Sequence, residues 1–233
     1  MDLDAQKPPG DLWVVIAAYN EEPRLGATVK GLRERGYNNV VVVDDGSSDK
    51  TKEVAFASGA WALRHIVNLG QGAALQTGIL FALDRGAATI VTFDADGQHD
   101  PDQIPRIIAP VRDGTAEVAL GSRFLGTAEN IPLARRLVLK GGVVFTRLFS
   151  GINVTDTHNG FRAFSRSAAE KLKIRQNRMA HASEILDQIQ SLRIHFVEVP
   201  VTIRYSAETM AKGQSSWNAL KIVAQLILGR FVR

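Results

Sequence analysis

One stretch of the chain reads Ala88-Thr89-Ile90-Val91-Thr92-Phe93-Asp94-Ala95-Asp96-Gly97-Gln98. Its first six residues are apolar or β-branched, which predicts a buried strand, so two carboxylates and an amide should emerge together at the strand's end. Such oxygen groups suit Mg²⁺ or Mn²⁺, and Mg²⁺ uses only one or two protein carboxylates while phosphates and waters complete its shell. The alternative is a solvated turn whose aspartates cap the next helix, and a short D-x-D pattern does not decide between the two.

Around this stretch, short apolar runs alternate with helical patterns. Strands are expected at 13–18, 40–43, 63–67, 88–93 and 117–120, with helices between them that end near Gly36, Gly59, Gly86 and Gly114. Asn20 is expected to cap the first helix, and Asp100 with Pro101 to open a later one. This order predicts an α/β fold with a mostly parallel central sheet and helices on both faces.

In such sheets, ligands bind beyond the carboxyl ends of the strands. Three acidic clusters follow predicted strands: Tyr19-Asn20-Glu21, Asp44-Asp45-Gly46-Ser47 and Asp94-Ala95-Asp96. Their shared edge favours a functional site over three unrelated turns. Gly70-Gln71-Gly72 lacks the third glycine of a dinucleotide loop, and there is no P-loop, so a dehydrogenase and a P-loop phosphotransferase are both disfavoured.

Composition is typical of a globular protein of 233 residues with a net charge of +4 and no cysteine. Disulfides, thiolate zinc sites and cysteine nucleophiles are therefore excluded. Residues 1–12 are expected to form a loose leader, 13–216 the catalytic domain, and 217–233 an amphipathic helix. That helix either lies in a membrane interface or packs on the core, and the sequence leaves both open.

Six motifs together resemble the inverting family-2 glycosyltransferases of the polyprenyl-phosphate (dolichyl-phosphate mannosyltransferase-like) branch. They are Ala17-Ala18-Tyr19-Asn20-Glu21, Val43-Asp44-Asp45-Gly46-Ser47, Asn68-Leu69-Gly70-Gln71-Gly72, Asp94-Ala95-Asp96-Gly97-Gln98-His99, Gly121-Ser122-Arg123-Phe124 and Asp156-Thr157-His158-Asn159-Gly160-Phe161-Arg162. The resemblance implies a nucleotide-diphospho-sugar transferase (GT-A, Rossmann-like) fold. It also implies transfer of one sugar from a UDP- or GDP-sugar to an undecaprenyl- or dolichyl-type phosphate at the cytoplasmic membrane face.

For the donor, the resemblance implies that the nucleobase and ribose contact Ala18, Tyr19, Glu21 and Asp45, with Asp44 in the same binding motif. Asp94 would lie beside the nucleoside, and Asp96 and Gln98 would bind Mg²⁺ or Mn²⁺; Asp94 is counted with them as a metal ligand. Relatives often carry proline in place of Ala17 and lysine in place of Gln71. Gln71 is therefore expected to make only a weak donor contact.

For the acceptor, a phosphate monoester is ionised near neutral pH and needs no general base. It does need cations: Arg123 lies just past the strand 117–120, and Arg135, Arg136 and Lys140 lie on the next predicted helix. A charged helix face is usually solvated, but the resemblance implies that Arg123 and Arg135 hold the phosphate, and Arg136 and Lys140 are counted as substrate-binding residues. Asp96, Arg123 and Arg135 form the expected catalytic set. Leu139 stands where relatives often carry a phosphate-binding serine.

The segment 204–216 resembles the family's mobile loop and is expected to close over the substrates, with Arg204 and Lys212 as substrate-binding residues. His99, His158 and His181 show no paired spacing, so structural roles are expected for them. His158-Asn159 replaces a threonine-serine pair frequent in relatives, and Asp156 and Arg162 are expected to brace the acceptor loop.

The expected partners are a nucleotide sugar, a polyprenyl phosphate and the membrane surface, with no nucleic acid. With these partners, we expect the protein at the inner face of the cell membrane, peripherally associated. Whether it forms a homo-oligomer or binds an integral membrane partner is left open by the sequence. The alternatives are a transferase with a non-lipid acceptor, or a non-catalytic nucleotide- or lipid-binding subunit. A nucleotidyltransferase would need a glycine-rich opening loop, and a processive synthase a Q-x-x-R-W motif, which Gln214-Ser215-Ser216-Trp217 lacks.

Overall fold

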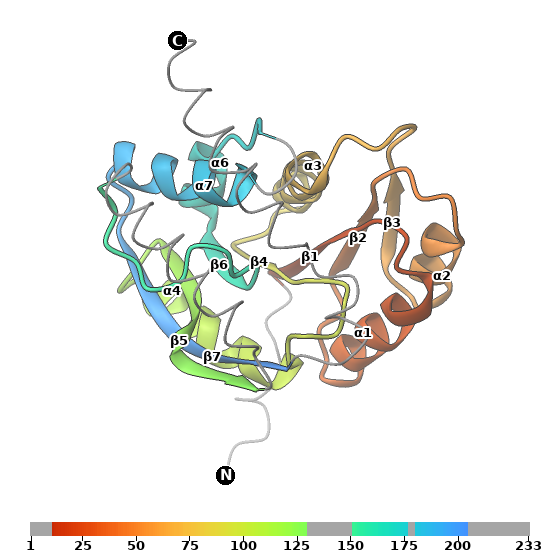
Figure 1. The fold of residues 1–233 in the computed structure, drawn as a ribbon, viewed down its shortest axis with the longest axis horizontal. Helices are drawn as coiled ribbons and strands as arrows, with labels where there is room; N and C mark the ends of the chain where they lie inside the picture. The colour runs from red at the N-terminus through yellow and green to blue at the C-terminus, as the bar shows by residue number, and fades with distance from the viewer. Residues whose placement is uncertain (1–10, 130–150, 177–179, 205–233) are drawn as a thin grey trace.

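The computed structural model describes residues 11–129, 151–176 and 180–204. Strands and helices alternate through the first half of the chain, and further strands complete the sheet in the second half (Figure 1). The elements, in chain order, are β1 Leu12–Ala18, α1 Glu22–Glu34, β2 Val40–Asp44, α2 Thr51–Ala57, β3 Trp61–Arg64, α3 Gln71–Asp84, β4 Thr89–Thr92, the 3-10 helix η2 Pro101–Gln103, α4 Ile104–Arg112, β5 Val118–Glu129, β6 Arg162–Ser165, α6 Arg166–Lys171, α7 Ala180–Ser191 and β7 Phe196–Arg204.

The central sheet has seven strands in the order β3-β2-β1-β4-β6-β5-β7. β1 pairs in parallel with β2 and β4, β2 with β3, and β5 with β7, whereas β6 is antiparallel to both β4 and β5. The predicted mostly parallel sheet is therefore confirmed, with one reversed strand in its middle. β1, β2, β4 and β5 all point the same way, so their carboxyl ends meet at one edge.

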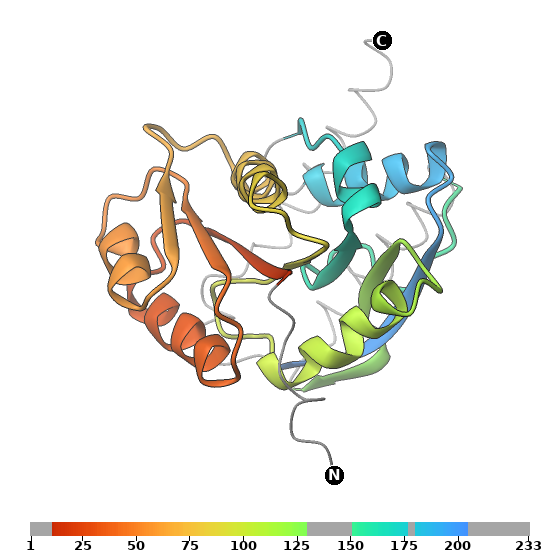
Figure 2. The ribbon, with the colours of Figure 1, turned by 180° about the vertical axis from the view of Figure 1, so that it is seen from behind.

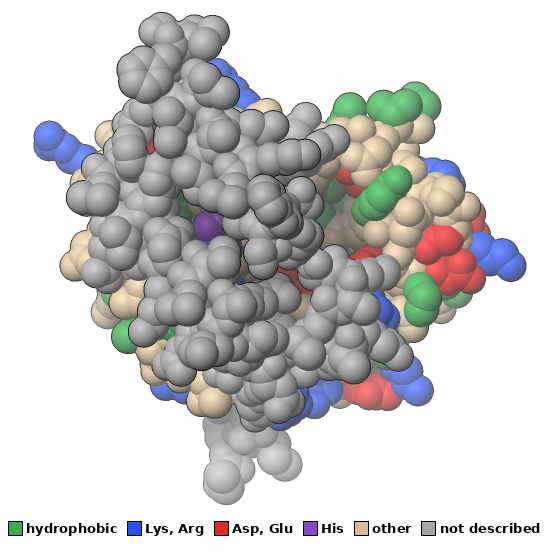
Figure 3. Space-filling view, viewed as in Figure 1, with side chains coloured by type: hydrophobic (Ala, Val, Ile, Leu, Met, Phe, Trp, Pro, Cys, Tyr) green, Lys and Arg blue, Asp and Glu red, His purple; other side chains and the backbone are tan. Residues whose placement is uncertain are grey.

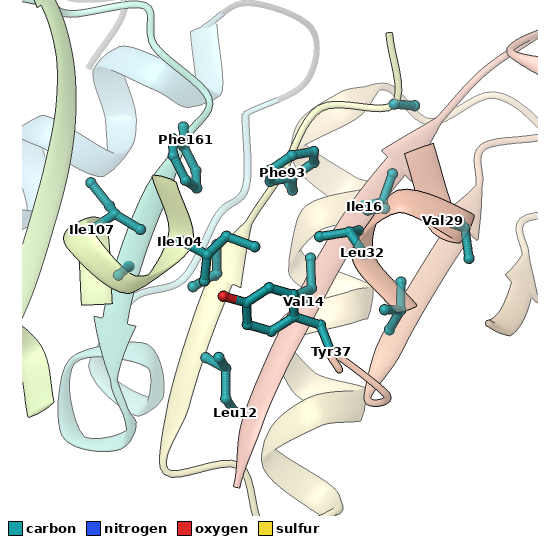
Figure 4. Close-up of a cluster of buried hydrophobic side chains, with 14 of the residues drawn as sticks. Leu12, Val14, Ile16, Val29, Leu32, Tyr37, Phe93, Ile104, Ile107 and Phe161 are labelled. Carbon is teal, nitrogen blue, oxygen red and sulfur yellow. The ribbon is translucent and has the colours of Figure 1, made fainter. Parts of the chain in front are cut away.

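Helices cover both faces of this sheet, as predicted, and each face has its own apolar core. Side chains alternate along the strands: Val14 and Ile16 of β1 pack under α1 and α4, while Trp13 and Val15 pack under α3. Figure 4 shows the first of these clusters, where Ile104 and Ile107 of α4 approach Phe161, and Leu32 of α1 lies over Val14. Figure 2 shows α3 and α6 from behind, on the face opposite α1.

Several local expectations differ from the structure. β3 spans Trp61–Arg64 rather than 63–67, because Val41–Asp44 of β2 pairs with this earlier segment and leaves Ile66 and Val67 exposed. β1 begins at Leu12, one residue inside the expected leader. Asn20 does not cap α1, because its φ is +53° and its Oδ1 instead accepts a hydrogen bond from the backbone N–H of Ser48 (2.9 Å).

The close packing of α3 on the sheet depends on Gly78. A Cβ at this position would lie 2.4 Å from Cγ1 of Val15 and 3.3 Å from Cγ2 of Val43, inside the buried core. We expect Gly78→Ala to lower the free energy of unfolding by about 1–3 kcal/mol, because the helix must move away from β1 and β2. Urea unfolding of the purified protein measures this change.

Gly31 provides the matched control, because it also lies inside a helix, and a Cβ there would meet its nearest neighbours only at 3.8 and 3.9 Å. Gly31→Ala should raise stability by about 0.5–1 kcal/mol, the usual gain from removing an interior helical glycine. If Gly78→Ala also raises stability, then α3 does not pack as closely on β1 as the contact with Val15 requires.

Candidate active site

An open cavity of about 530 Å³ lies at the edge where β1, β2 and β4 end, a size common for small-molecule sites. In Figure 3, imidazole and acidic side chains are visible in the middle of the view. The lining residues are Ala17, Ala18, Tyr19, Glu21, Asp45, Asn68, Gly70, Gln71, Asp94, Ala95, Asp96, Gln98, His99, Arg123, His158, Asn159, Gly160, Arg162, His181, Ala182 and Ile203.

The loop after β1 is held to the loop after β2 by hydrogen bonds between backbone and side chains. The N–H of Asn20 donates to Oγ of Ser47 (2.9 Å), and the N–H of Glu21 donates to Oγ1 of Thr51 (2.9 Å). Tyr19 is left about half exposed, beside Ala18 and Glu21 in the cavity wall. This arrangement gives the β1 side of the cavity one aromatic ring and one carboxylate.

Asp44 and Asp45 are neighbours with different environments. Asp44 is fully buried and does not line the cavity; its Oδ1 accepts from the N–H of Ser47 (2.9 Å) and its Oδ2 lies 3.4 Å from Nε of Arg64. Asp45 lines the cavity, and its carboxylate accepts from the N–H groups of Leu69 (3.0 Å) and Gly70 (2.6 Å) and from Nδ1 of His65 (2.8 Å). Asp45 therefore holds the backbone directly before α3 at the edge of the cavity.

The two carboxylates of the D-x-D motif also differ. Burial acts to raise the pKa of Asp94, but the hydrogen bond from His99 and the nearby His181 and Arg162 outweigh it, so this pKa lies below its ordinary value. For Asp96, burial and the negative charge of Asp94 raise the pKa. Asp96 accepts a hydrogen bond from the N–H of Gln98 (3.0 Å). Of the two carboxylates, Asp96 is therefore the one whose negative charge the surroundings stabilise less.

Cationic and neutral nitrogen groups form the opposite wall. Arg123 lies within β5, not past its end as expected, because the strand extends to Glu129 and its register with β7 breaks between Ser122 and Thr127. Nε of Arg123 donates to Oδ2 of Asp156 (2.6 Å), and both side chains are almost completely buried. Arg162 begins β6; burial lowers its pKa to about 10, which leaves it charged at neutral pH beside Asp156 and Asp94.

Most of the predicted donor residues are brought together here. Nine of the predicted site residues line the cavity: Ala18, Tyr19, Glu21, Asp45, Gln71, Asp94, Asp96, Gln98 and Arg123. Asp44 and Arg204 do not line it, and Nη1 of Arg204 lies 3.2 Å from Oδ2 of Asp100. Arg135, Arg136, Lys140 and Lys212 lie outside the described residues, as do 205–216 and 217–233, so their roles stay predictions.

Sequence reasoning missed the grouping of His99, His158 and His181, which all line this cavity although they come from three separate segments. Burial lowers the pKa of His158, so it is neutral at pH 7. For His99, the signal was its position directly after the acidic motif. For His181, at the start of α7, nothing in the sequence pointed to the site, because only the packing of α7 beside α3 brings it there.

The donor set fits a divalent cation. Asp96 and Gln98 offer oxygen ligands at the cavity wall, and a cation beside Asp96 would relieve the repulsion from Asp94 that raises its pKa. Among the described residues, no group of three or more His, Cys, Asp or Glu side chains could hold a metal ion. A cation here would therefore be shared with phosphate oxygens and water, as is common for Mg²⁺.

Comparison with known proteins gives consistent results. Residues 13–173 match the family model described as glycosyl transferase family 2. The UDP-N-acetylglucosamine–dolichyl-phosphate N-acetylglucosaminyltransferase of Methanococcus voltae is 35% identical over 93% of this chain and 95% of its own length. The undecaprenyl-phosphate mannosyltransferase of Micrococcus luteus is 32% identical over 81% of this chain and 81% of its own.

Among solved structures, glucosyl-3-phosphoglycerate synthase from Mycobacterium tuberculosis, in complex with Mn²⁺ and UDP-glucose, superposes with a TM-score of 0.70. The alignment covers 93% of this chain and 77% of that one, at 20% sequence identity. At that identity the likeness shows the shared GT-A fold.

Proposed function

Since the chain belongs to glycosyl transferase family 2, and is thus a glycosyltransferase as its sequence predicted, we propose that it moves one sugar, with inversion, from a nucleotide-diphospho-sugar to a polyprenyl phosphate. The observation that carries the proposal is that one cavity is lined by two sets of side chains, which we call its two walls. Tyr19, Glu21 and Asp96 form an acidic, aromatic wall, and Arg123 and Arg162 a cationic one.

On the first wall, the ring of Tyr19 offers a surface for a base, and Glu21 and Asp45 offer acceptors for the donor's N–H and O–H groups. Mg²⁺ or Mn²⁺, held by Asp96 and Gln98 with Asp94 beside them, would neutralise the charge that develops on the departing nucleoside diphosphate. Nε2 of Gln71 lies 3.5 Å from Oδ1 of Asp94, at the limit of a hydrogen bond, and its weak contact with the donor stays a prediction.

On the second wall, Arg123 and Arg162 provide positive charge for an anionic acceptor. In the proposed step, an ionised phosphate oxygen forms a bond to the anomeric carbon while the bond from that carbon to the diphosphate oxygen breaks. The nucleoside diphosphate leaves with the electron pair, and no proton has to be removed from the attacking oxygen. The arginines hold the acceptor and offset the repulsion between two anionic substrates.

A polyprenyl phosphate is anchored in a membrane, so we place the protein at the cytoplasmic membrane face, peripherally associated. In the part of the chain that the structure describes, no helix is long and apolar enough to cross a membrane. The predicted loop 204–216 and the predicted amphipathic helix 217–233 would supply contacts to the acceptor and to the membrane.

A transfer assay tests this function directly. The full chain is incubated with MnCl₂, undecaprenyl phosphate and a panel of UDP- and GDP-sugars, with EDTA in a parallel reaction. We expect a glycosyl phospholipid with one donor, and none with EDTA. A full rate of transfer in EDTA would contradict the proposed metal dependence. Transfer to a soluble phosphate but not to undecaprenyl phosphate would contradict the proposed lipid acceptor.

A further inference from the structure

We propose that His99 is a positioning residue that fixes the carboxylate of Asp94 in the orientation in which it meets the nucleotide and its metal ion. The inference rests on the proposed function and adds a residue for which only a structural role was expected. It depends on three features of the cavity: the hydrogen bond to Asp94, the packing of the imidazole ring, and the close approach of Gly160.

The hydrogen bond defines the tautomer of His99. Its Nε2 lies 2.8 Å from Oδ2 of Asp94, and an ionised carboxylate can only accept, so Nε2 must carry the proton. Among the described residues, the buried Nδ1 has no hydrogen-bond partner, so the ring is held through Nε2. The ring therefore has one orientation that serves Asp94.

Packing holds the ring in that orientation. The His99 side chain is 2% exposed, and its ring centroid lies 5.4 Å from that of Phe93 and 5.1 Å from that of Phe161. Both phenylalanines are themselves fully buried and in edge contact with each other. The imidazole is thus supported by two rigid side chains, one just before the acidic motif and one just before β6.

The backbone at Gly160 also confines Asp94. A Cβ at Gly160 would lie 2.5 Å from Oδ1 and 2.7 Å from Oδ2 of Asp94, so only glycine leaves room for the carboxylate. Gly160 is in turn held by Oγ1 of Thr92, which donates to its carbonyl oxygen (2.6 Å). The carboxylate is thus next to both His99 and Gly160, with about a third of the side chain open to the cavity.

This geometry gives the two aspartates of the motif different roles. Asp94 is held by His99 and Gly160 and cannot turn freely, whereas Asp96 accepts from the nearby N–H of Gln98 and is left to meet a cation. Partners behind a ligand residue commonly change affinity by about 10- to 100-fold when they are removed. His99 should therefore matter for nucleotide and metal binding although it need not touch either.

Two substitutions of His99 test the proposal. His99→Phe keeps a ring between Phe93 and Phe161 but removes the donor, whereas His99→Gln offers an amide N–H in place of Nε2–H. Binding of UDP and of GDP is measured by calorimetry in MnCl₂. We expect His99→Phe to weaken binding by about 10-fold or more, and His99→Gln to remain within about 3-fold of wild type. His195→Phe, at an exposed histidine outside the cavity, should have no effect.

Two further measurements keep the test decisive if His99→Phe folds poorly. Gly160→Ala places a Cβ against the same carboxylate and should weaken nucleotide binding about 10-fold with His99 intact. A long-range ¹H–¹⁵N spectrum of the wild-type protein should show His99 with its proton on Nε2.

Binding as tight as wild type in folded His99→Phe, equal losses in the Phe and Gln variants, or an Nε2 that carries no proton would each overturn the role of His99. If the wild-type protein transfers sugar and binds nucleotide while His99→Phe does so equally well, only this inference fails. If the wild-type protein binds neither UDP nor GDP, the proposed function fails together with it.

Discussion

Replacing Asp96 with asparagine should lower sugar transfer by about 100-fold or more while leaving the folded protein at least as stable as the wild type. The loss of activity follows if Asp96 holds the ion that offsets charge on the leaving diphosphate, since removing one group that stabilises developing charge typically costs about 10²- to 10³-fold in rate. The retained or increased stability of the variant follows from the surroundings of Asp96 in the cavity.

Burial and the charge of Asp94 raise the pKa of Asp96 above its unfolded value, so the charged form of Asp96 destabilises the folded state near neutral pH. Asparagine removes that cost. The stability difference between the variant and the metal-free wild type should therefore be largest near neutral pH. It should shrink as pH falls through the folded pKa and vanish below the unfolded pKa of about 3.9.

Thermal unfolding with and without MnCl₂ and UDP measures both effects in one experiment. Ligand should raise the unfolding temperature of the wild type and of the control Asp187→Asn, an exposed position on α7, but not that of Asp96→Asn. An equal increase in all three proteins, or unchanged turnover in Asp96→Asn, would remove Asp96 from the metal site.

Asp156→Ala should destabilise the protein by about 3–5 kcal/mol, the usual loss when one partner of a buried ion pair is removed. Oδ2 of Asp156 accepts from both Nε (2.6 Å) and the backbone N–H (3.1 Å) of Arg123, and its Oδ1 accepts from the N–H of His158 (3.3 Å). Without Asp156, the guanidinium of Arg123 stays buried beside the positive charge of Arg162. Sugar transfer should fall as well, because Arg123 loses its fixed position.

Urea unfolding measures the loss, and Glu170→Ala is the control. Glu170 pairs with Arg166 one turn away at an exposed position, where such a pair contributes less than about 1 kcal/mol. The double variant Arg123→Met/Asp156→Ala should lose less stability than the sum of the single variants, because both charges of the buried pair are removed together. Additive losses would mean that the two side chains do not stabilise each other.

The structure also shows why Arg123 and Asp156 have this geometry. The carboxylate of Glu198 on β7 accepts from the N–H (2.8 Å) and Oγ1 (2.8 Å) of Thr155 and from the N–H of Asp156 (3.2 Å). β7 thus holds the segment before β6 against β5, where Arg123 lies. These contacts fix Asp156 beside Arg123, and its role in bracing an acceptor loop stays a prediction. Glu198 carried no signal in the sequence.

Local pattern was enough to predict the alternation of strands and helices, the mostly parallel sheet, and the shared edge at which Tyr19, Asp45 and Asp96 lie. These features depend on side chains close together in the chain: an apolar run forms a buried strand, and polar residues that follow it must lie at the strand's end. Boundaries such as that of β3, and the cap expected at Asn20, were wrong because pairing with β2 and the bond to Ser48 overrode local preference.

Tertiary structure decided which further groups reach the cavity and which predicted residue is kept out of it. Asp44 and Asp45 are adjacent in sequence, but the direction of each side chain at the end of β2 buries one and turns the other to the cavity. His99, His158 and His181 come together because a reversed β6 and the helix α7 return to the edge of β4. Charge and hydrogen-bonding capacity belong to single residues and can be identified from sequence, whereas distance and burial depend on how separate segments pack.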